Sequence, residues 1–209
     1  YVGVVDPCNI KPDYTYEITM TVYTDCSGIL MSTSDFINFQ SINSGLPQDN
    51  VEMQCVDPTT GAPVPANYQG TITSSLCPAY ANQSTCYSGG TYPGYKIWKY
   101  VGTVTLPSAQ SDWKFWYQSC CRNMAVVNFP YGNGFYIEAG INNIARYDVS
   151  TPEFTSFPLP YICAGLPFKY LNGPFDPDKT TNGQYMRVSN KNPMDAGPTP
   201  VPYQTGFTL

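Results

Sequence analysis

The sequence has no histidine and few charged residues, and both deficits exclude classes of function. Without histidine, the chain can form neither a histidine-dependent catalytic triad nor a histidine-bearing zinc site or haem site. Charged residues make up 12% of the 209 residues, and 15 acidic side chains outnumber 10 basic ones. Because nucleic-acid binding needs clustered lysine and arginine, we expect no nucleic-acid partner.

Long apolar runs are also missing. No stretch approaches the roughly 20 apolar residues of a transmembrane helix, and no basic region followed by an apolar region opens the chain. We therefore expect no direct membrane insertion, and we interpret Tyr1 as the start of a processed or trimmed secreted chain. The 42% of hydrophobic residues are enough for a folded core, and they exclude a disordered chain.

The cysteines are the clearest positive feature. Their even number and the lack of C-x-x-C pairs favour structural disulfides over a metal site, so we expect an oxidising, extracellular location and no metal or organic cofactor held by sulfur. We expect all eight to be oxidised: Cys8, Cys26, Cys55, Cys77, Cys86, Cys120, Cys121 and Cys163.

Apolar and polar residues alternate in several segments, which is typical of half-buried β-strands. The clearest pattern covers residues 14–24, and it recurs at 98–106, 113–121 and 135–141. Weaker strand candidates are 37–42, 51–56, 168–171, 185–189 and 203–209. Since no ten-residue stretch has a helical apolar period, the sequence predicts an all-β fold: a disulfide-stabilised immunoglobulin-like β-sandwich followed by a partial second β-sandwich module.

The proline-rich segment 154–167 is predicted to join two modules, because each proline keeps the preceding residue out of the helical conformation. We place a disulfide-rich β-sandwich domain at residues 1–155 and the start of a second immunoglobulin-like module at 156–209. The second part is shorter than the roughly 100 residues of a complete sandwich. We expect it to be completed by further domains of the same polypeptide or by a strand from a neighbouring subunit.

Strings spread over nearly the whole chain resemble one family of large surface proteins. The most specific are Cys120-Cys121-Arg122-Asn123 and Pro160-Tyr161-Ile162-Cys163-Ala164-Gly165, and shorter ones are Tyr23-Thr24-Asp25-Cys26-Ser27-Gly28, Leu76-Cys77-Pro78 and Tyr136-Ile137-Glu138-Ala139. In these strings the sequence resembles the N-terminal region of SprB-type gliding-motility adhesins of Bacteroidota, which the type IX secretion system exports. The resemblance implies an extracellular, repeat-bearing adhesin or filament subunit at the bacterial cell surface.

Two acidic residues of the second part, Asp176 and Asp178, are candidate calcium ligands together with the nearby Asn172 and Asn182. In the adhesin family an Asp-Pro-Asp-Gly-Asp turn follows the Pro-Tyr-Ile-Cys-Ala-Gly string. Residues 176–179 instead read Asp-Pro-Asp-Lys, so the glycine and the third acidic residue are missing. The alternative is an Asp-Pro turn capped by its own side chains.

The positions of the cysteines favour one pairing. A short loop flanked by proline and glycine separates Cys77 from Cys86, so we expect a disulfide between them. Cys120 and Cys121 are adjacent in a predicted strand and should point to opposite faces, Cys121 into the core and Cys120 toward a covering loop. A strained disulfide between these two neighbours is the alternative. We expect Arg122 to be internal, where its guanidinium caps loop carbonyls.

Aromatic residues outside the strand patterns are candidates for a ligand-binding surface. Five tyrosines lie among glycine, proline, serine and asparagine, where a ring can meet a sugar: Tyr80, Tyr87, Tyr92, Tyr95 and Tyr131. We expect no catalytic residues, because no pair of carboxylates is marked by its local sequence. The predicted function is a non-enzymatic adhesin or surface-filament module that meets a surface polysaccharide, and the alternative is a carbohydrate-binding module of a larger secreted enzyme.

Overall fold

The computed structural model describes residues 2–5, 14–74, 76–120, 122, 132, 134–144, 149–156, 165–167, 169, 171, 173–178, 189, 191–195 and 197–203. Nearly all regular elements of these residues are strands. They are β1 (Val2–Val5), β2 (Thr15–Asp25), β3 (Ser34–Gln40), β4 (Asp49–Val56), β5 (Thr71–Thr73), β6 (Tyr95–Thr105), β7 (Trp113–Ser119), β8 (Phe135–Ile141), β9 (Glu153–Phe154), β10 (Pro174–Phe175), β11 (Met194–Asp195) and β12 (Thr199–Pro200), with one short 3-10 helix, η1 (Pro78–Gln83).

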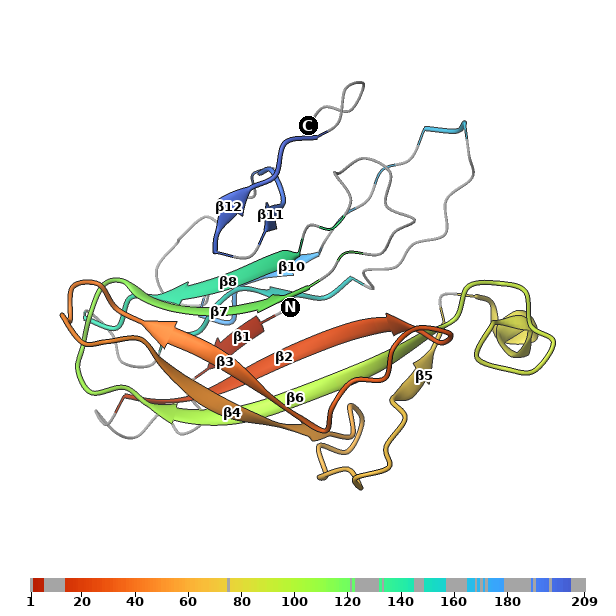
Figure 1. Ribbon diagram of the computed structural model, residues 1–209, viewed down its shortest axis with the longest axis horizontal. Helices are drawn as coiled ribbons and strands as arrows, with labels where there is room; N and C mark the ends of the chain where they lie inside the picture. The colour runs from red at the N-terminus through yellow and green to blue at the C-terminus, as the bar shows by residue number, and fades with distance from the viewer. Residues whose placement is uncertain are drawn as a thin grey trace.

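Strands β1 to β8 form one antiparallel sheet in the order β1-β2-β6-β4-β3-β7-β8, and β5 pairs with β6 (Figure 1). The longest pairing joins β2 to β6 along 11 residues, from Thr15 opposite Thr105 to Asp25 opposite Tyr95. Strand β4 turns the sheet, because it pairs with β3 over most of its length and with β6 at residues 54–56. Since β1 also lies against β8, the sheet curls around a core. The predicted all-β, sandwich-like fold is confirmed.

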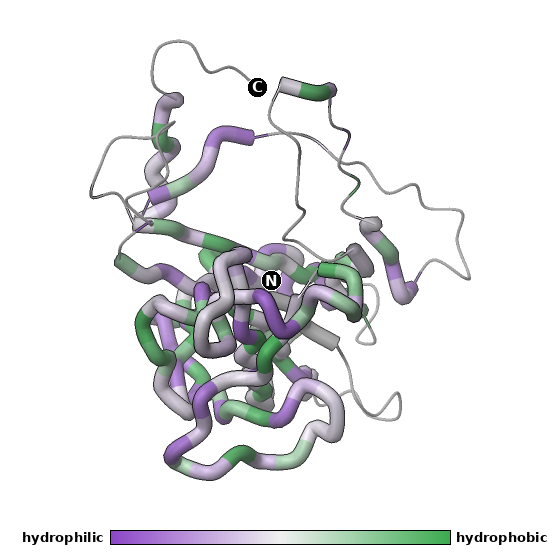
Figure 2. Tube along the Cα trace, turned by 90° about the vertical axis from the view of Figure 1, so that its right-hand side faces the viewer, coloured by the Kyte–Doolittle hydropathy of each residue, from purple (hydrophilic) through white to green (hydrophobic). Residues whose placement is uncertain are grey.

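The alternating pattern of the sequence produces the two faces of this sheet. On β2, the side chains of Tyr16, Ile18 and Met20 are fully buried, and the residues between them are half-buried. On β6, Trp98 and Tyr100 lie in the same core. Figure 2, which looks along the sandwich from the end that carries η1, shows hydrophobic and hydrophilic residues interspersed along the trace. Each large side chain buried in this way contributes about 1.5–3 kcal/mol to folding.

Gly102 is required where β4 packs across β6. It lies on the buried face of β6, opposite Ile18 of β2. A Cβ atom at this position would come within 2.6 Å of the Met53 sulfur and 2.8 Å of the Glu52 carbonyl oxygen. Because backbone cannot retreat from such a contact, the close approach of β4 that closes the core depends on this glycine.

Polar groups of the core aromatic residues have hydrogen-bond partners. The Tyr100 hydroxyl donates to the Ser32 carbonyl oxygen at 2.6 Å, and the Tyr117 hydroxyl donates to the Asp35 carboxylate at 2.9 Å. Burial raises the pKa of Tyr100 strongly, and burial together with the Asp35 hydrogen bond raises the pKa of Tyr117 to about 12. These tyrosines therefore stay neutral through the physiological range.

Beyond β8 the described strands are two residues long and form two small antiparallel pairs, β9 with β10 and β11 with β12. Strand β9 pairs across the predicted boundary at 155/156, so the division into two modules stays a prediction. Strand β11 packs against β8 of the first part. The Gly134 amide donates to the Asp195 carboxylate at 2.6 Å, and the Gly197 amide donates to the Gln118 side-chain oxygen at 3.1 Å.

The weaker strand predictions have different outcomes. Those at 37–42 and 51–56 correspond to β3 and β4, which begin two or three residues earlier than expected. Of the predicted strands at 168–171, 185–189 and 203–209, only residues 169, 171, 189 and 203 are described, and none of these four lies in a strand. The remaining residues of these three predictions lie outside the described part of the chain.

Candidate functional site

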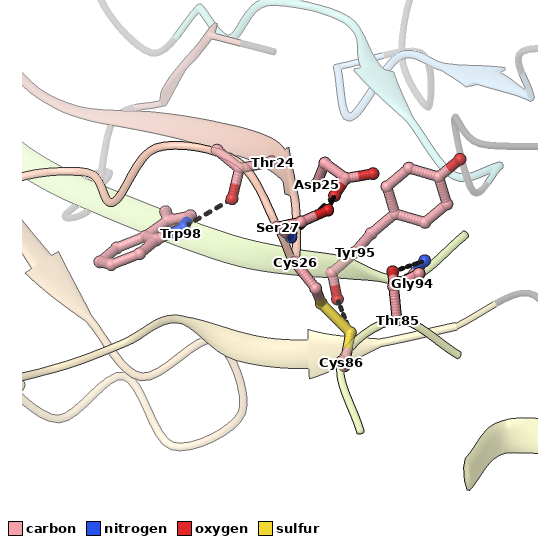
Figure 3. The surroundings of a disulfide bond; sticks show 9 residues. All are labelled: Thr24, Asp25, Cys26, Ser27, Thr85, Cys86, Gly94, Tyr95 and Trp98. Atoms are coloured by element: carbon pink, nitrogen blue, oxygen red, sulfur yellow. Dashed lines mark hydrogen bonds between the residues drawn. A yellow bond between two sulfur atoms is a disulfide. The ribbon is translucent and has the colours of Figure 1, made fainter. Parts of the chain in front are cut away.

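A disulfide fixes a long loop to one end of the sandwich. Cys26 follows β2 and Cys86 lies in the loop that leads into β6, and their sulfurs are bonded with the two Cα atoms 5.0 Å apart (Figure 3). Because β2 and β6 pair up to Asp25 and Tyr95, the chain enters and leaves this end side by side. The Cys26 amide also donates to the Gly94 carbonyl oxygen at 2.9 Å. Residues 77–94, which we call the tyrosine loop, are therefore anchored covalently and by the sheet.

The predicted disulfide between Cys77 and Cys86 is wrong. The pairing of β2 with β6 places Cys26, not Cys77, beside Cys86, and η1 occupies the chain between Cys77 and Cys86. Cys77 is exposed with a free thiol. The expectation that every cysteine is oxidised is also wrong for Cys55, whose free thiol is buried in the core.

The other cysteines are only partly accounted for. Burial raises the pKa of the Cys55 thiol, which keeps this core residue protonated and inert. Cys120 is disulfide-bonded. The predicted opposite orientation of Cys120 and Cys121, and the alternative of a bond between them, stay predictions, because Cys8, Cys121 and Cys163 lie outside the described residues.

The tyrosine loop is closed by its own backbone hydrogen bonds. The amides of Thr91 and Tyr92 donate to the Gln83 carbonyl oxygen at 2.8 and 3.0 Å, and the Thr85 amide donates to the Tyr92 carbonyl oxygen at 2.7 Å. A Cβ atom at Gly90 would lie 1.9 Å from the Ser84 carbonyl oxygen, so this closure depends on glycine. The two arms of the loop consequently hold each other in one conformation.

The base of the loop is held by polar side chains. Figure 3 shows Thr85 and Gly94 beside the disulfide, where the Gly94 amide donates to the Thr85 hydroxyl at 2.9 Å. Across the strand pair, the Trp98 indole nitrogen donates to the Thr24 hydroxyl at 3.1 Å. The loop base is thereby continuous with the packed core.

Three of the five candidate tyrosines are exposed on this loop. Tyr80, Tyr87 and Tyr92 are 52%, 42% and 44% exposed, and their hydroxyls have no hydrogen-bond partner among the described residues. Tyr95 is half-buried at the start of β6, and Tyr131 lies outside the described residues. Figure 1 places η1 and its loop at one end of the sandwich. Three of the five predicted rings are thus exposed on one anchored loop.

The chain around these rings carries no charge. Residues 58–95 contain no Asp, Glu, Lys or Arg; the nearest charged residues along the chain are Asp57 and Lys96, and Asp25 of β2 lies opposite Tyr95 at the base of the loop. Within the tyrosine loop the other exposed side chains are mostly hydroxyl and amide groups, at Asn82, Gln83, Thr85, Ser88 and Thr91. The lack of charged residues in this segment is visible in the sequence, and it is a signal that supports the prediction of a tyrosine-bearing ligand surface.

The candidate calcium ligands accept hydrogen bonds from backbone amides. The Asp178 amide donates to the Asp176 carboxylate at 2.9 Å, as in a turn capped by its own side chain. The Ser150 amide, distant in the sequence, donates to the Asp178 carboxylate at 2.6 Å. In the part of the chain that the structure describes, no three His, Cys, Asp or Glu residues gather into a metal site. Asn172 and Asn182 lie outside that part.

Arg122 has the predicted internal role. Its guanidinium donates to the Met194 carbonyl oxygen in β11 at 2.7 Å. Because Met194 pairs with β12, this bond ties the last small strand pair to the segment that follows β7. Arg122 was expected to cap loop carbonyls, but the carbonyl that it caps belongs to the short strand β11.

A depression of about 340 Å³ lies on β7 and β8 and is lined by two carboxylates, Asp112 and Glu138. Asp112 accepts the Ser41 hydroxyl at 2.6 Å and the Asn43 amide at 3.0 Å, and these hydrogen bonds lower its pKa. Glu138 lies 3.2 Å from the Lys114 ammonium and accepts the Tyr136 hydroxyl at 2.8 Å. Both carboxylates are thus engaged by neighbouring side chains or by a backbone amide.

The comparisons with known proteins add no family. No family description, curated protein or solved structure matches the chain. Within the described residues, no helix has the length and apolar character needed to span a membrane.

Proposed function

We propose that this chain is a non-enzymatic adhesive module that works outside the cell, on the bacterial surface, as part of a longer adhesin or filament. The tyrosine loop is its contact element. The observation that carries the proposal is the loop itself: three exposed aromatic rings on a backbone closed by hydrogen bonds and tied to the sandwich by the Cys26–Cys86 disulfide. Exposed rings on a pre-ordered loop favour contact with another surface.

The disulfide supports the extracellular location. A structural disulfide persists in an oxidising compartment and is rare in the cytosol. The gliding-motility resemblance, with export by the type IX secretion system, fits the same location. Of the two free thiols of the described residues, Cys55 is buried in the core and protected from oxidation, whereas Cys77 is exposed.

The position of the rings favours an adhesin over the carbohydrate-binding module of an enzyme. Such a module is expected to hold its aromatic rings in a concave cleft. Here the exposed tyrosines lie on a loop at the end of the sandwich, and the depression on β7 and β8 is lined by Trp113, which is buried in the core. The engaged carboxylates Asp112 and Glu138 support the absence of catalysis.

Exposed apolar residues in the last third of the chain support an assembly with further protein. Among the described residues after β8, five large apolar side chains are more than half exposed: Ile144, Phe154, Leu166, Leu171 and Phe175. Strands of two residues cannot bury them. Further domains of the same polypeptide or neighbouring subunits are the partners that would cover them.

The proposal is tested by adhesion under flow. Beads coated with the purified chain are passed over cells of the source organism and over glass, and the shear needed to detach them is measured. We expect the coated beads to resist detachment at least several times better than albumin-coated beads. Antibodies raised against the chain should label intact cells. Beads that detach as easily as the albumin control, or antibodies that label only broken cells, would contradict the proposal.

A further inference from the structure

We propose that the tyrosine loop binds an uncharged polysaccharide, with the rings of Tyr80, Tyr87 and Tyr92 packing against sugar faces. This inference rests on the proposed adhesive function and names the chemistry of its ligand. A membrane surface and an apolar protein are the competing occupants, and the exposed side chains of the loop argue against both.

The tyrosine loop carries no charged side chain. The protein as a whole has a net charge of −5, yet residues 58–95 contribute nothing to it. A loop that binds an acidic polymer or a phospholipid headgroup would present lysine or arginine to it. The nearest cation along the chain is Lys96, which follows the loop on β6. The absence of charge on this loop therefore fits an uncharged ligand.

The loop exposes no large aliphatic side chain. Residues 77–94 contain no Val, Ile, Leu, Met, Phe or Trp, and the exposed apolar surface of the loop comes from the tyrosine rings together with Pro78, Ala79 and Pro93. A surface that inserts into lipid or docks an apolar protein face uses aliphatic side chains. Sugar rings instead have small patches of C–H groups surrounded by hydroxyls, and a flat amphipathic ring matches such a patch.

Side chains that form hydrogen bonds lie between the tyrosines in the sequence. Asn82 and Gln83 lie between Tyr80 and Tyr87, and Ser88 and Thr91 lie between Tyr87 and Tyr92, all of them exposed. Amide and hydroxyl groups both donate and accept hydrogen bonds, as sugar hydroxyls do. The loop thus alternates ring faces with groups that match the rim of a sugar.

The tyrosine loop is held in one conformation by its own bonds. Sugar chains bind weakly per residue, so a site that must be ordered on binding loses most of its affinity. The hydrogen bonds from Thr91 and Tyr92 to Gln83 and the disulfide at Cys86 order the loop before any ligand arrives.

The inference is tested by affinity electrophoresis of the full chain in native gels that contain dextran, a β-1,3-glucan or a galactomannan, with hyaluronan as the charged polymer. We expect at least one uncharged polymer to retard the protein and hyaluronan to have no effect. The variant Y80A/Y87A/Y92A should bind about 10- to 100-fold more weakly, and Y80F/Y87F/Y92F, which keeps the rings, should stay within about threefold.

A matched control removes three equally exposed rings elsewhere, in the variant F36A/F154A/F175A, whose rings are 52%, 52% and 51% exposed. This variant should bind like the parent chain, and unchanged urea unfolding midpoints show that each variant is folded. The inference is overturned if none of the three uncharged polymers retards the chain, if the tyrosine-to-alanine variant binds as well as the parent, or if hyaluronan or phosphatidylcholine vesicles bind equally well.

The bead assay separates this inference from the proposed function. Beads that adhere to cells while none of the uncharged polymers binds would refute the polysaccharide ligand and keep the adhesive function. Beads that fail to adhere would refute the adhesive function as well.

Discussion

The sandwich buries its apolar side chains, whereas the last third of the chain, by which we mean the residues after β8, exposes most of them. Strands β2 and β6 pair along 11 residues and bury alternate large side chains such as Tyr16, Trp98 and Tyr100 completely, whereas β9 to β12 are two residues long. The described apolar residues of the last third, such as Phe154 and Phe175, are mainly exposed, and Val201 is the buried one among them. Both regions are rich in aromatic residues, but proline is about twice as frequent in the last third as in the rest of the chain.

The difference lies in what each region packs against. Strand pairs of two residues are not stable alone in water, because too little surface is buried to offset the entropy of ordering the chain. The pair β11 and β12 is instead held to the first part by bonds from Arg122, Gly134 and Gly197. Stability in this molecule therefore resides in the sandwich, and the last third depends on contacts to it.

The strongest test of this difference is a pair of ring deletions. Trp98→Ala should destabilise the protein by about 3–5 kcal/mol, because Trp98 is fully buried and its ring meets that of Tyr68 at 5.2 Å. Phe154→Ala in the last third should change stability by about 0.5 kcal/mol or less. Urea unfolding of both variants gives the comparison, and similar losses in the two would refute it.

Removing the disulfide comes next. The variant C26A/C86A should lose about 2–4 kcal/mol, since the bond closes a loop with a sequence separation of 60 residues. The same urea experiment applies, and a reducing agent added to the parent chain should reproduce much of the loss. Cys77→Ala is the matched control and should have no effect, because Cys77 is free and exposed. A loss in the control equal to that in the double variant would restore the pairing of Cys77 with Cys86.

Alkaline pH should weaken the sandwich by a smaller amount. The pKa values of Tyr100, Tyr117 and Tyr136 are raised, that of Tyr117 to about 12, mainly by burial. A raised folded-state pKa means that the fold stabilises the neutral phenol. Its contribution is complete below the unfolded pKa of 10.0 and is lost as pH rises toward and through about 12.

For the three partly screened tyrosines together we expect a loss on the order of 2 kcal/mol. Urea midpoints measured from pH 8 upward should fall above pH 10, with phenolate absorbance rising in the same range. Tyr117→Phe should make the fall shallower. A midpoint independent of pH over this range would contradict the prediction.

The smallest effect is expected at the contact between the two regions. Asp195→Asn keeps an acceptor for the Gly134 amide but removes the charge, and it should weaken the contact by about 0.5–1 kcal/mol. The loss should be local, so hydrogen exchange of the Gly134 amide should speed up several-fold while the urea midpoint of the sandwich stays unchanged. A lower midpoint would mean that the last third stabilises the whole fold.

Sequence patterns predicted the parts of the fold that two-residue periodicity determines. Strands β2, β6, β7 and β8 were predicted within a few residues, because one face of each is buried against the same core. Strand β5 was missed, since a strand of three residues is too short to show alternation. The helix η1 has six residues and only Pro78 at its start as a signal.

The residues of the candidate site could be predicted from the sequence, but their arrangement in space could not. Glycine and proline around Tyr80, Tyr87 and Tyr92 correctly indicated exposed rings. The partner of Cys86 could not be inferred from nearness in the sequence, because it depends on the register of β2 against β6. Pairings that join distant segments follow from sheet topology, which a local pattern does not encode.

The Cys26–Cys86 bond also determines how much of the chain a pulling force can stretch. It lies at the end of the longest strand pair, and strands β3, β4 and β5 all fall between its two cysteines. Tension applied to the two ends of the polypeptide passes through the sulfur bridge and bypasses the enclosed residues. At about 3.3–3.6 Å per residue, this withholds about 200 Å of extended chain from the force. The oxidised module can therefore be extended only by the residues outside the bridge, whereas the reduced module can be extended to its full contour length.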